Sequence, residues 1–226
     1  MNIKESLKSS FLYPLFDKTR DYYLYLKRKP YFSRLREYIY PDTSIITPNC
    51  FAGRIMQDLG TKYNSPTLGL YFFASDYLEF VSNLRYYLTE AKIEFVESSK
   101  YELGNERRAE WPHWYPIGVL GGKVEIEFLH YYTEEEAAEK WYRRASRINW
   151  NDLIVIGMEQ NLCNDQLMYD FDALPFVRKV FFSTKEMNLN SVVAIKEFAN
   201  NNDVGDPYKK GHVFYKYLVE FLSNNK

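Results

Sequence analysis

From Thr43 onward, short β-branched or apolar runs alternate with helical stretches, and this alternation limits the folds that the chain can adopt. Such runs are typical of strands, and helices between them are typical of βαβ units with parallel strands. The pattern therefore predicts an α/β fold: an open, mainly parallel sheet flanked by helices in a Rossmann-like three-layer arrangement. Strands are predicted at 43–48, 67–73, 92–96, 123–129, 152–157 and 177–183, with a further one at 191–195.

Helix-start signals place two of the helices. Asp76 and Glu79 have capping-box-like spacing and open a predicted helix over 76–90, and Thr133 with Glu136 forms the box itself before a helix over 134–147. A closing helix is predicted at 212–222. Residues 98–122 combine Gly, Pro, two tryptophans and charges without periodicity, which predicts a long ordered loop.

Residues 1–40 differ from the rest of the chain in charge. They hold nine lysines and arginines against four acids, mixed with tyrosines. We expect a basic, aromatic, helical N-terminal extension here, followed by a single α/β domain over 41–226. The extension could rest on an anionic membrane face. Alternatively it packs on the domain, which Pro14 and Pro30 favour because they interrupt a long helical face.

The overall composition limits the partners and the compartment. Lysine and arginine (29) balance aspartate and glutamate (30), so no global field attracts nucleic acid. Cys50 and Cys163 give neither a zinc spacing nor a disulfide framework, and the first residues lack the apolar core of a signal peptide. The longest apolar stretch is too short for a membrane span. The predicted location is cytoplasmic, with peripheral contact at the inner membrane face through residues 1–40.

The turn after the first predicted strand is the first candidate site. Ligands of α/β sheets bind beyond the carboxyl ends of strands, and a helix start favours phosphate. Gly53, Arg54 and Asp58 are therefore candidate substrate-binding residues, and Asn49 is a candidate catalytic amide. Cys50 beside it is either a nucleophile or a small buried hydrophobic residue.

His130 follows the predicted strand 123–129 and is the second candidate. If that strand and 43–48 share one parallel sheet, His130 and Asn49 project from the same edge, where a general base is needed. Tyr131 would then contact substrate. The alternative is a hydrogen-bonded structural histidine in a strand-to-helix turn.

Four cations follow on one face of the helix over 134–147: Lys140, Arg143, Arg144 and Arg147. Lys140, Arg144 and Arg147 are candidate ligands of a diphosphate, although ion pairs with Glu136 and Glu139 explain a cationic stripe equally well. Asp170 and Asp172 form an Asp-x-Asp pattern, which holds a divalent cation in some glycosyltransferases but also fits the end of a helix. We predict no metal site and assign no cofactor.

Several motifs together resemble a known family over about residues 43–185. They are Asn49-Cys50-Phe51-Ala52-Gly53, Asn64-Ser65-Pro66-Thr67, Tyr115-Pro116-Ile117-Gly118, His130-Tyr131, Lys140-Trp141-Tyr142-Arg143-Arg144 and Arg147-Ile148-Asn149. In this order they resemble the uncharacterised family labelled exopolysaccharide biosynthesis protein, domain of unknown function DUF1919. The resemblance implies a bacterial cytoplasmic α/β protein associated with surface polysaccharide synthesis.

These observations lead to two hypotheses. In the first, the protein is a transferase that acts on a nucleotide-linked or lipid-linked sugar, with His130 as the base. In the second, it is a non-catalytic sugar-binding or docking partner of a polysaccharide assembly complex. A hydrolase is a weaker third, because no nucleophile or metal site stands out.

Overall fold

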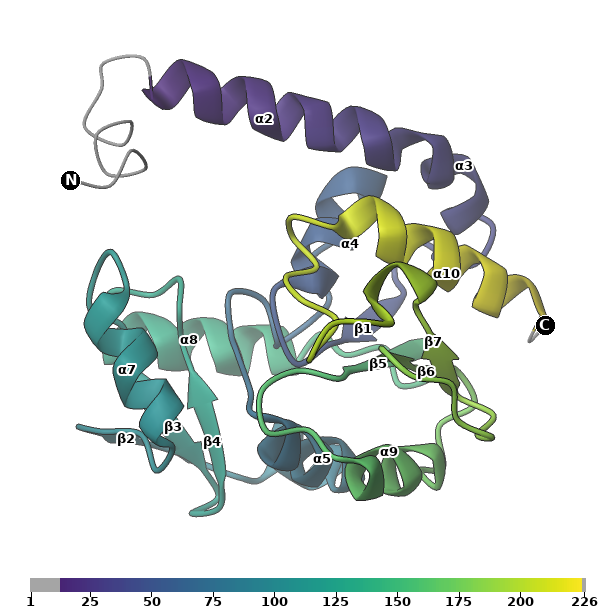
Figure 1. Ribbon diagram of the computed structural model, residues 1–226. Coiled ribbons are helices and arrows are strands. Elements are labelled where there is room, and N and C mark those ends of the chain that lie inside the picture. Colours follow the sequence, from purple (N-terminus) through teal and green to yellow (C-terminus); the bar gives the residue numbers. More distant parts are fainter. Residues whose placement is uncertain (1–12, 225–226) are drawn as a thin grey trace.

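The computed structural model describes residues 13–224, with side chains from residue 18 onward. The chain is a mixed α/β protein with two sheets (Figure 1). The first sheet is entirely parallel and has the order β1-β5-β6-β7. Its strands are β1 (Ser44–Ile46), β5 (Leu153–Met158), β6 (Lys179–Ser183) and β7 (Val192–Ala194). The strands predicted at 43–48, 152–157, 177–183 and 191–195 all belong to this sheet.

The second sheet is antiparallel and differs from the prediction. It has the order β2-β3-β4, with β2 (Ile93–Val96), β3 (Ile117–Leu120) and β4 (Val124–Glu127). The prediction that 92–96 and 123–129 join the parallel sheet is therefore wrong. The connection from β3 to β4 is too short for a parallel crossover, and Gly121 and Gly122 adopt φ values of 58° and 71° in the hairpin turn.

The strand predicted at 67–73 is not formed. A turn occupies 66–69, and Gly69 in it has a φ of 74°. Tyr71 alone makes an isolated antiparallel bridge, with Glu127 of β4. The run is apolar because it is buried between the two sheets, and burial does not require ladder pairing.

The helices largely follow the predicted order. The helix expected at 76–90 is two helices that meet at Asn83, and the one expected at 134–147 is capped by Thr133, whose Oγ1 accepts the Glu136 amide N–H at 3.1 Å. The loop predicted at 98–122 instead contains α7 (Glu102–Glu110) and β3. The helices from α4 onward are α4 (Phe51–Leu59), α5 (Ala74–Ser82), α6 (Leu84–Thr89), α7 (Glu102–Glu110), α8 (Glu134–Ala145), α9 (Asp165–Asp172), the 3-10 helix η2 (Lys196–Phe198) and α10 (Gly211–Asn224).

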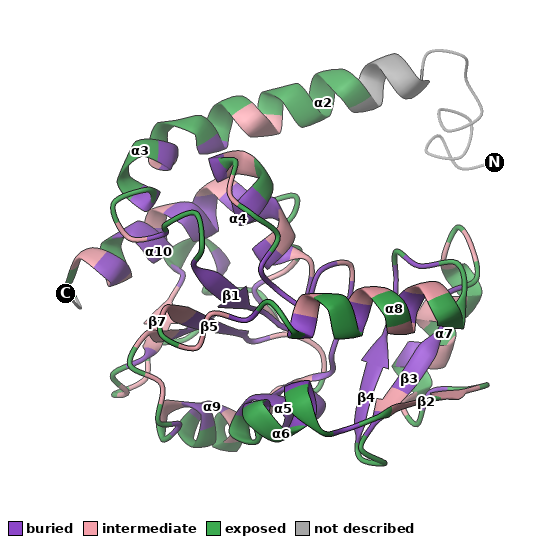
Figure 2. Cartoon of the chain, turned by 180° about the vertical axis from the view of Figure 1, so that it is seen from behind, coloured by how far each residue is buried: buried purple, intermediate pink, exposed green. Residues whose placement is uncertain are grey.

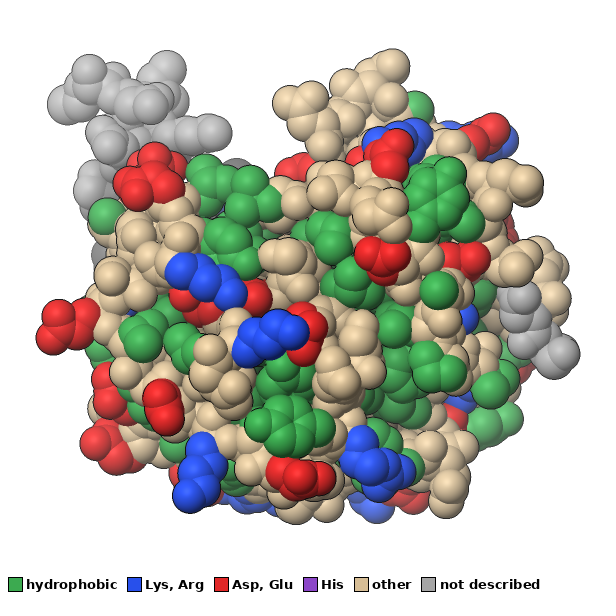
Figure 3. Space-filling model, turned by 90° about the horizontal axis from the view of Figure 1, so that it is seen from below, with side chains coloured by type: hydrophobic (Ala, Val, Ile, Leu, Met, Phe, Trp, Pro, Cys, Tyr) green, Lys and Arg blue, Asp and Glu red, His purple; other side chains and the backbone are tan. Residues whose placement is uncertain are grey.

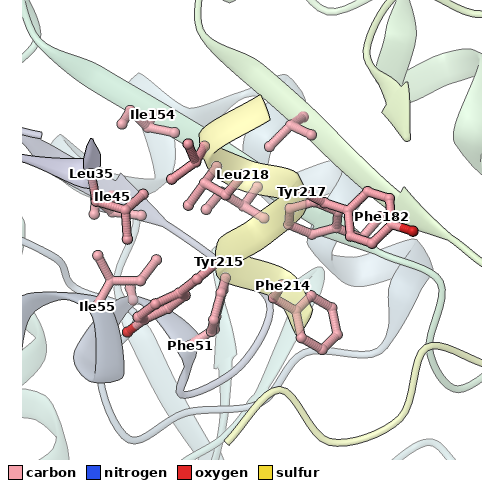
Figure 4. Close-up of a cluster of buried hydrophobic side chains, with 14 of the residues drawn as sticks. Leu35, Ile45, Phe51, Ile55, Ile154, Phe182, Phe214, Tyr215, Tyr217 and Leu218 are labelled. Atoms are coloured by element: carbon pink, nitrogen blue, oxygen red, sulfur yellow. The ribbon is translucent and has the colours of Figure 1, made fainter. Parts of the chain in front are cut away.

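Two apolar clusters lie on opposite faces of the parallel sheet. Alternate strand residues divide between them, since side chains of a strand point to opposite faces: Ile45 and Ile154 belong to the first, and Ile46 and Val155 to the second. The first cluster packs α4 and α10 on the sheet, as Figure 4 shows for Phe51 and Leu218 among others. The second packs α5, α8 and α9.

The N-terminal segment is helical, with α2 (Tyr13–Arg28), the 3-10 helix η1 (Lys29–Tyr31) and α3 (Phe32–Leu35). Residues 1–12 of the predicted extension lie outside the described residues. The end of α2 is fixed by a buried ion pair in which Arg28 Nε lies 2.5 Å from Asp58 Oδ2 of α4. The Tyr215 hydroxyl of α10 donates to the same oxygen at 2.9 Å. Among the described helices none is long and apolar enough to cross a membrane.

Candidate functional site

The carboxyl ends of β1 and β5 open a crevice at the edge of the parallel sheet. The crevice forms because the chain leaves the two strands toward opposite faces of the sheet: α4, which follows β1, packs in the first apolar cluster, whereas α9, which follows β5, packs in the second. Asn49 stands at this point. Its Nδ2 donates to Gln160 Oε1 at 2.8 Å, and its Oδ1 accepts the Phe51 amide N–H at 3.0 Å. Its amide therefore links the two strand ends and holds the first residue of α4.

A cleft of about 530 Å³ lies over this crevice, and both sheets contribute to its walls. The Asn49 loop and Gln160 come from the parallel sheet, whereas Leu129 and His130 follow β4 of the antiparallel sheet. Asn49 and His130 thus line one cleft, although they do not belong to one parallel sheet. The lining residues are Arg20, Asp21, Asn49, Cys50, Leu70, Tyr71, Arg107, Trp111, Leu129, His130, Gln160, Asp206, Pro207 and Tyr208.

Arg107 of α7 supplies a fixed positive charge to the cleft. Its guanidinium pairs with the buried Glu127 carboxylate of β4, donates to Asn161 Oδ1 at 2.9 Å, and lies 4.0 Å from the centre of the Tyr71 ring. Burial raises the pKa of Glu127 to about 7, and the charge of Arg107 opposes this rise. Because carboxylate, amide and ring hold it from three sides, Arg107 is held in place before any ligand binds.

His130 stands where this cleft meets a smaller groove. Its side chain reaches the surface, and its ring meets the Trp111 ring edge-on at 6.2 Å between centres. The described part of the chain offers the imidazole no hydrogen bond. Lost hydration among the surrounding side chains, and then the charge of His113, lower the pKa of His130 below 6.5. His130 is therefore neutral at pH 7 and can accept a proton.

The smaller groove, of about 180 Å³, is cationic. It brings together four predicted binding residues: Gly53, Tyr131, Lys140 and Arg144. Arg144 donates to the Tyr131 hydroxyl and to the Leu68 carbonyl, while Lys140 pairs with Glu136 one turn earlier on α8. A Cβ on Gly69 would lie 3.2 Å from the Cβ of His130, so the groove wall needs glycine for its space as well as for its backbone angles.

Three other predicted binding residues line neither cavity. Arg54 is buried, its guanidinium lies 3.6 Å from the centre of the Tyr208 ring, and its Nε has no partner; burial, and then the charge of Arg28, lower its pKa. Asp58 is bound to Arg28 and to a tyrosine hydroxyl. Arg147 is exposed beyond the end of α8. Only Arg54 touches the cleft indirectly, through Tyr208.

Cys50 lines the cleft as a protonated thiol. Burial, and then the charge of Asp206, raise its pKa to about 12, and its Sγ lies 3.8 Å from the Leu70 carbonyl oxygen. Such a thiol is a poor nucleophile at neutral pH. Of the Asp-x-Asp pattern, Asp172 accepts two bonds from Ser191 and Asp170 one from the Gln166 side chain. Within residues 13–224, no group of three or more His, Cys, Asp or Glu is placed to hold a metal ion.

Sequence reasoning missed most of the cleft's polar wall. Gln160 lies three residues after the predicted strand 152–157, so a search slightly further beyond the strand ends could have found it. Arg107 and Trp111 lie in residues 98–122, where the sequence predicts a loop. Tyr208 lies in a turn, and no local pattern indicates which residues lie next to it in space.

Comparison with known proteins places the chain in a family. The family model described as "Domain of unknown function (DUF1919)" matches residues 15–224, which is nearly the whole chain. The chain belongs to this family. An uncharacterised protein of Haemophilus influenzae is 34% identical over 180 residues, covering 79% of this chain and 80% of its own. The match to the family model therefore includes the cleft, the cationic groove and α2 from residue 15 onward.

Proposed function

We propose that this DUF1919 protein is a transferase that acts on a sugar activated by phosphate, as in a nucleotide-linked or lipid-linked sugar. The association with surface polysaccharide synthesis belongs to the same proposal. One observation carries it: a neutral imidazole without a hydrogen bond, that of His130, stands between an aromatic cleft and a cationic groove.

The two cavities differ in what they can bind. The cleft presents Tyr71, Trp111 and Tyr208, and aromatic faces with polar edges suit sugar rings. The groove presents Lys140 and Arg144, whose charges suit phosphate oxygens. A phosphate-linked sugar that spans both cavities would place its glycosidic bond beside His130.

The reaction then follows from the roles of these groups. His130 removes the proton from an acceptor hydroxyl, and the hydroxyl oxygen attacks the anomeric carbon of the sugar. The bond from that carbon to the phosphate oxygen breaks, and the phosphate leaves with the electron pair. Lys140 and Arg144 stabilise the charge that develops on this leaving group. Arg107, already fixed by Glu127, orients the sugar hydroxyls or a second phosphate.

Isothermal titration with a panel of nucleotide sugars and sugar phosphates tests the binding part of the proposal. Lys140→Met should raise the Kd of phosphate-containing ligands about tenfold, because a hydrogen bond between charged groups contributes roughly 1.5 kcal/mol. Arg143→Met is the matched control: Arg143 also pairs with a glutamate four residues earlier, Glu139, but lines neither cavity. If no member of the panel binds, the proposal is wrong.

A coupled transfer assay then separates catalysis from simple binding. His130→Ala should reduce transfer by about 10²–10⁴ and leave ligand affinity nearly unchanged. Tight binding without transfer in the unmodified protein would favour the second hypothesis, a non-catalytic sugar-binding partner. Full transfer by His130→Ala would refute the role of the imidazole.

A further inference from the structure

Helix α2 packs on α10 and the first apolar cluster through Tyr25 and Arg28, whereas most of its other side chains from residue 18 onward are exposed. Of its side chains from residue 18 onward, Arg28 alone is buried, and the helix is exposed over most of its length in Figure 2. Three large side chains of the helix are exposed to solvent: Tyr22 is 63% exposed, Tyr23 55% and Leu26 45%. Large apolar and tyrosine side chains that face water together on one side of a helix indicate a partner surface.

The three large exposed side chains form one stripe along the helix. With 3.6 residues per turn, Tyr22, Leu26 and Tyr23 fall within an arc of about 100°. Lys18 and Lys27 lie about 40° beyond the two edges of this arc. Both lysines are exposed. Asp21 lies on the far side of the helix and lines the cleft.

This arrangement is typical of a helix that lies in a lipid interface. Apolar and tyrosine side chains enter the boundary between headgroups and acyl chains, and lysines on both flanks reach the headgroup phosphates. Charge favours an anionic surface, since residues 1–40 carry nine lysines and arginines against four acids whereas residues 41–226 carry 20 against 26. By contrast, Figure 3 shows acidic and basic side chains interspersed on the face that carries α5 and α9.

A second copy of the chain fits the stripe less well. A stable protein interface buries about 800 Å² on each partner, and three exposed side chains on one helix supply only part of that. A fluid lipid surface needs no matching shape and attracts each flanking lysine separately.

We propose that α2 docks in the plane of an anionic phospholipid surface, with Tyr22, Tyr23 and Leu26 inserted and Lys18 and Lys27 on the headgroups. The docking surface goes beyond the proposed function and does not depend on it, because none of these five side chains lines the cleft. Its consequence for the site is that Arg20 and Asp21 of α2, at the cleft wall, bring the cleft close to the lipid. A substrate carried on a lipid would then reach the cleft from the membrane.

Vesicle flotation of the full-length protein tests the proposal. We expect the protein to float with vesicles of phosphatidylcholine mixed with phosphatidylglycerol, and to float weakly with phosphatidylcholine alone. Lys27→Glu should lower partitioning by at least fivefold, since a single lysine near the surface contributes about that factor. Lys92→Glu is its control, because Lys92 is exposed elsewhere on the molecule and the change in net charge is the same. Tyr22→Ser with Leu26→Ser should also release the protein, whereas Tyr169→Ser on α9 should not.

The outcomes that overturn the proposal are distinct. It is overturned if the protein floats equally well with both vesicle types, if it floats with neither, or if the Lys27 and Lys92 variants behave alike. A dimer in solution that the α2 substitutions dissociate, without flotation, would identify a second copy as the partner. His130→Ala should float normally, so failure of the transferase proposal leaves this result untouched. Circular dichroism checks that every variant remains folded.

Discussion

The buried ion pair that holds α2 offers a sharp test of the structure. Asp58→Asn should lower the free energy of unfolding by about 3–5 kcal/mol, because both partners' side chains are only 3% exposed and Arg28 would be left without its countercharge. Asparagine preserves the size of the side chain and still accepts the Tyr215 hydroxyl, so the substitution isolates the charge. The charge of Asp58 also raises the pKa of Arg54, so Arg54 would lose the same countercharge. For a chain of this length, the loss corresponds to a fall in Tm of roughly 10 °C.

Urea unfolding of a double-mutant cycle provides the measurement. Arg28→Met alone should lower the free energy of unfolding strongly. Together, Arg28→Met and Asp58→Asn should lower it by about 2 kcal/mol less than the sum of the two single effects. Asp42→Asn is the control, because Asp42 pairs with Lys62 through side chains that are 65% and 70% exposed, and surface pairs contribute little. Additive single effects, or a cost of Asp58→Asn no larger than that of Asp42→Asn, would show that α2 is not held in this way.

Three further predictions follow from the pKa shifts. The pKa of Glu127 is about 7 in the folded protein and 4.5 ordinarily, so between these pH values the folded state binds a proton that the unfolded state does not, and this contribution to stability is lost as pH rises from 4.5 to 7. In urea unfolding, Glu127→Gln should therefore reduce the difference in stability between pH 5 and pH 8. An unchanged difference would mean that the carboxyl group is ionised at both pH values. Because the pKa of His130 lies below 6.5, transfer should stay level above that pH and decline below it, whereas a decline that begins above pH 7 would contradict a lowered pKa. Cys50 should react with iodoacetamide at pH 8 far more slowly than a small free thiol, as mass spectrometry would show, and equal rates would place it in solvent.

Local signals predicted the parallel sheet and its helices well. The strands β1, β5 and β6 are short apolar runs bounded by polar turns, and Thr133 with Glu136 provides a helix cap that tertiary structure did not override. The sequence does not predict the helix α7, because only Gly104 of its nine residues is buried and the segment therefore has no apolar periodicity. The hairpin of β3 and β4 did carry a signal, since Gly121-Gly122 separates two strand-like runs.

The candidate site was predicted in part and for an incomplete reason. Asn49 and His130 were expected together because their strands were assigned to one sheet. The structure brings them together because the segment between the sheets joins both: Tyr71 bridges to Glu127 of β4, and the Phe72 amide N–H donates to the Pro48 carbonyl after β1. No local pattern encodes that contact, which also explains why Arg107 and Tyr208 were not predicted as members of the cleft.

The division of the cleft between two sheets has a thermodynamic consequence. A compound that fills it can bind only when both sheets are assembled, and the unfolded chain has no comparable affinity for it. A free ligand concentration a thousandfold above Kd would therefore stabilise the native state by about 4 kcal/mol, whatever reaction follows. A shift in melting temperature across a compound library can thus reveal the natural ligand before any turnover assay exists.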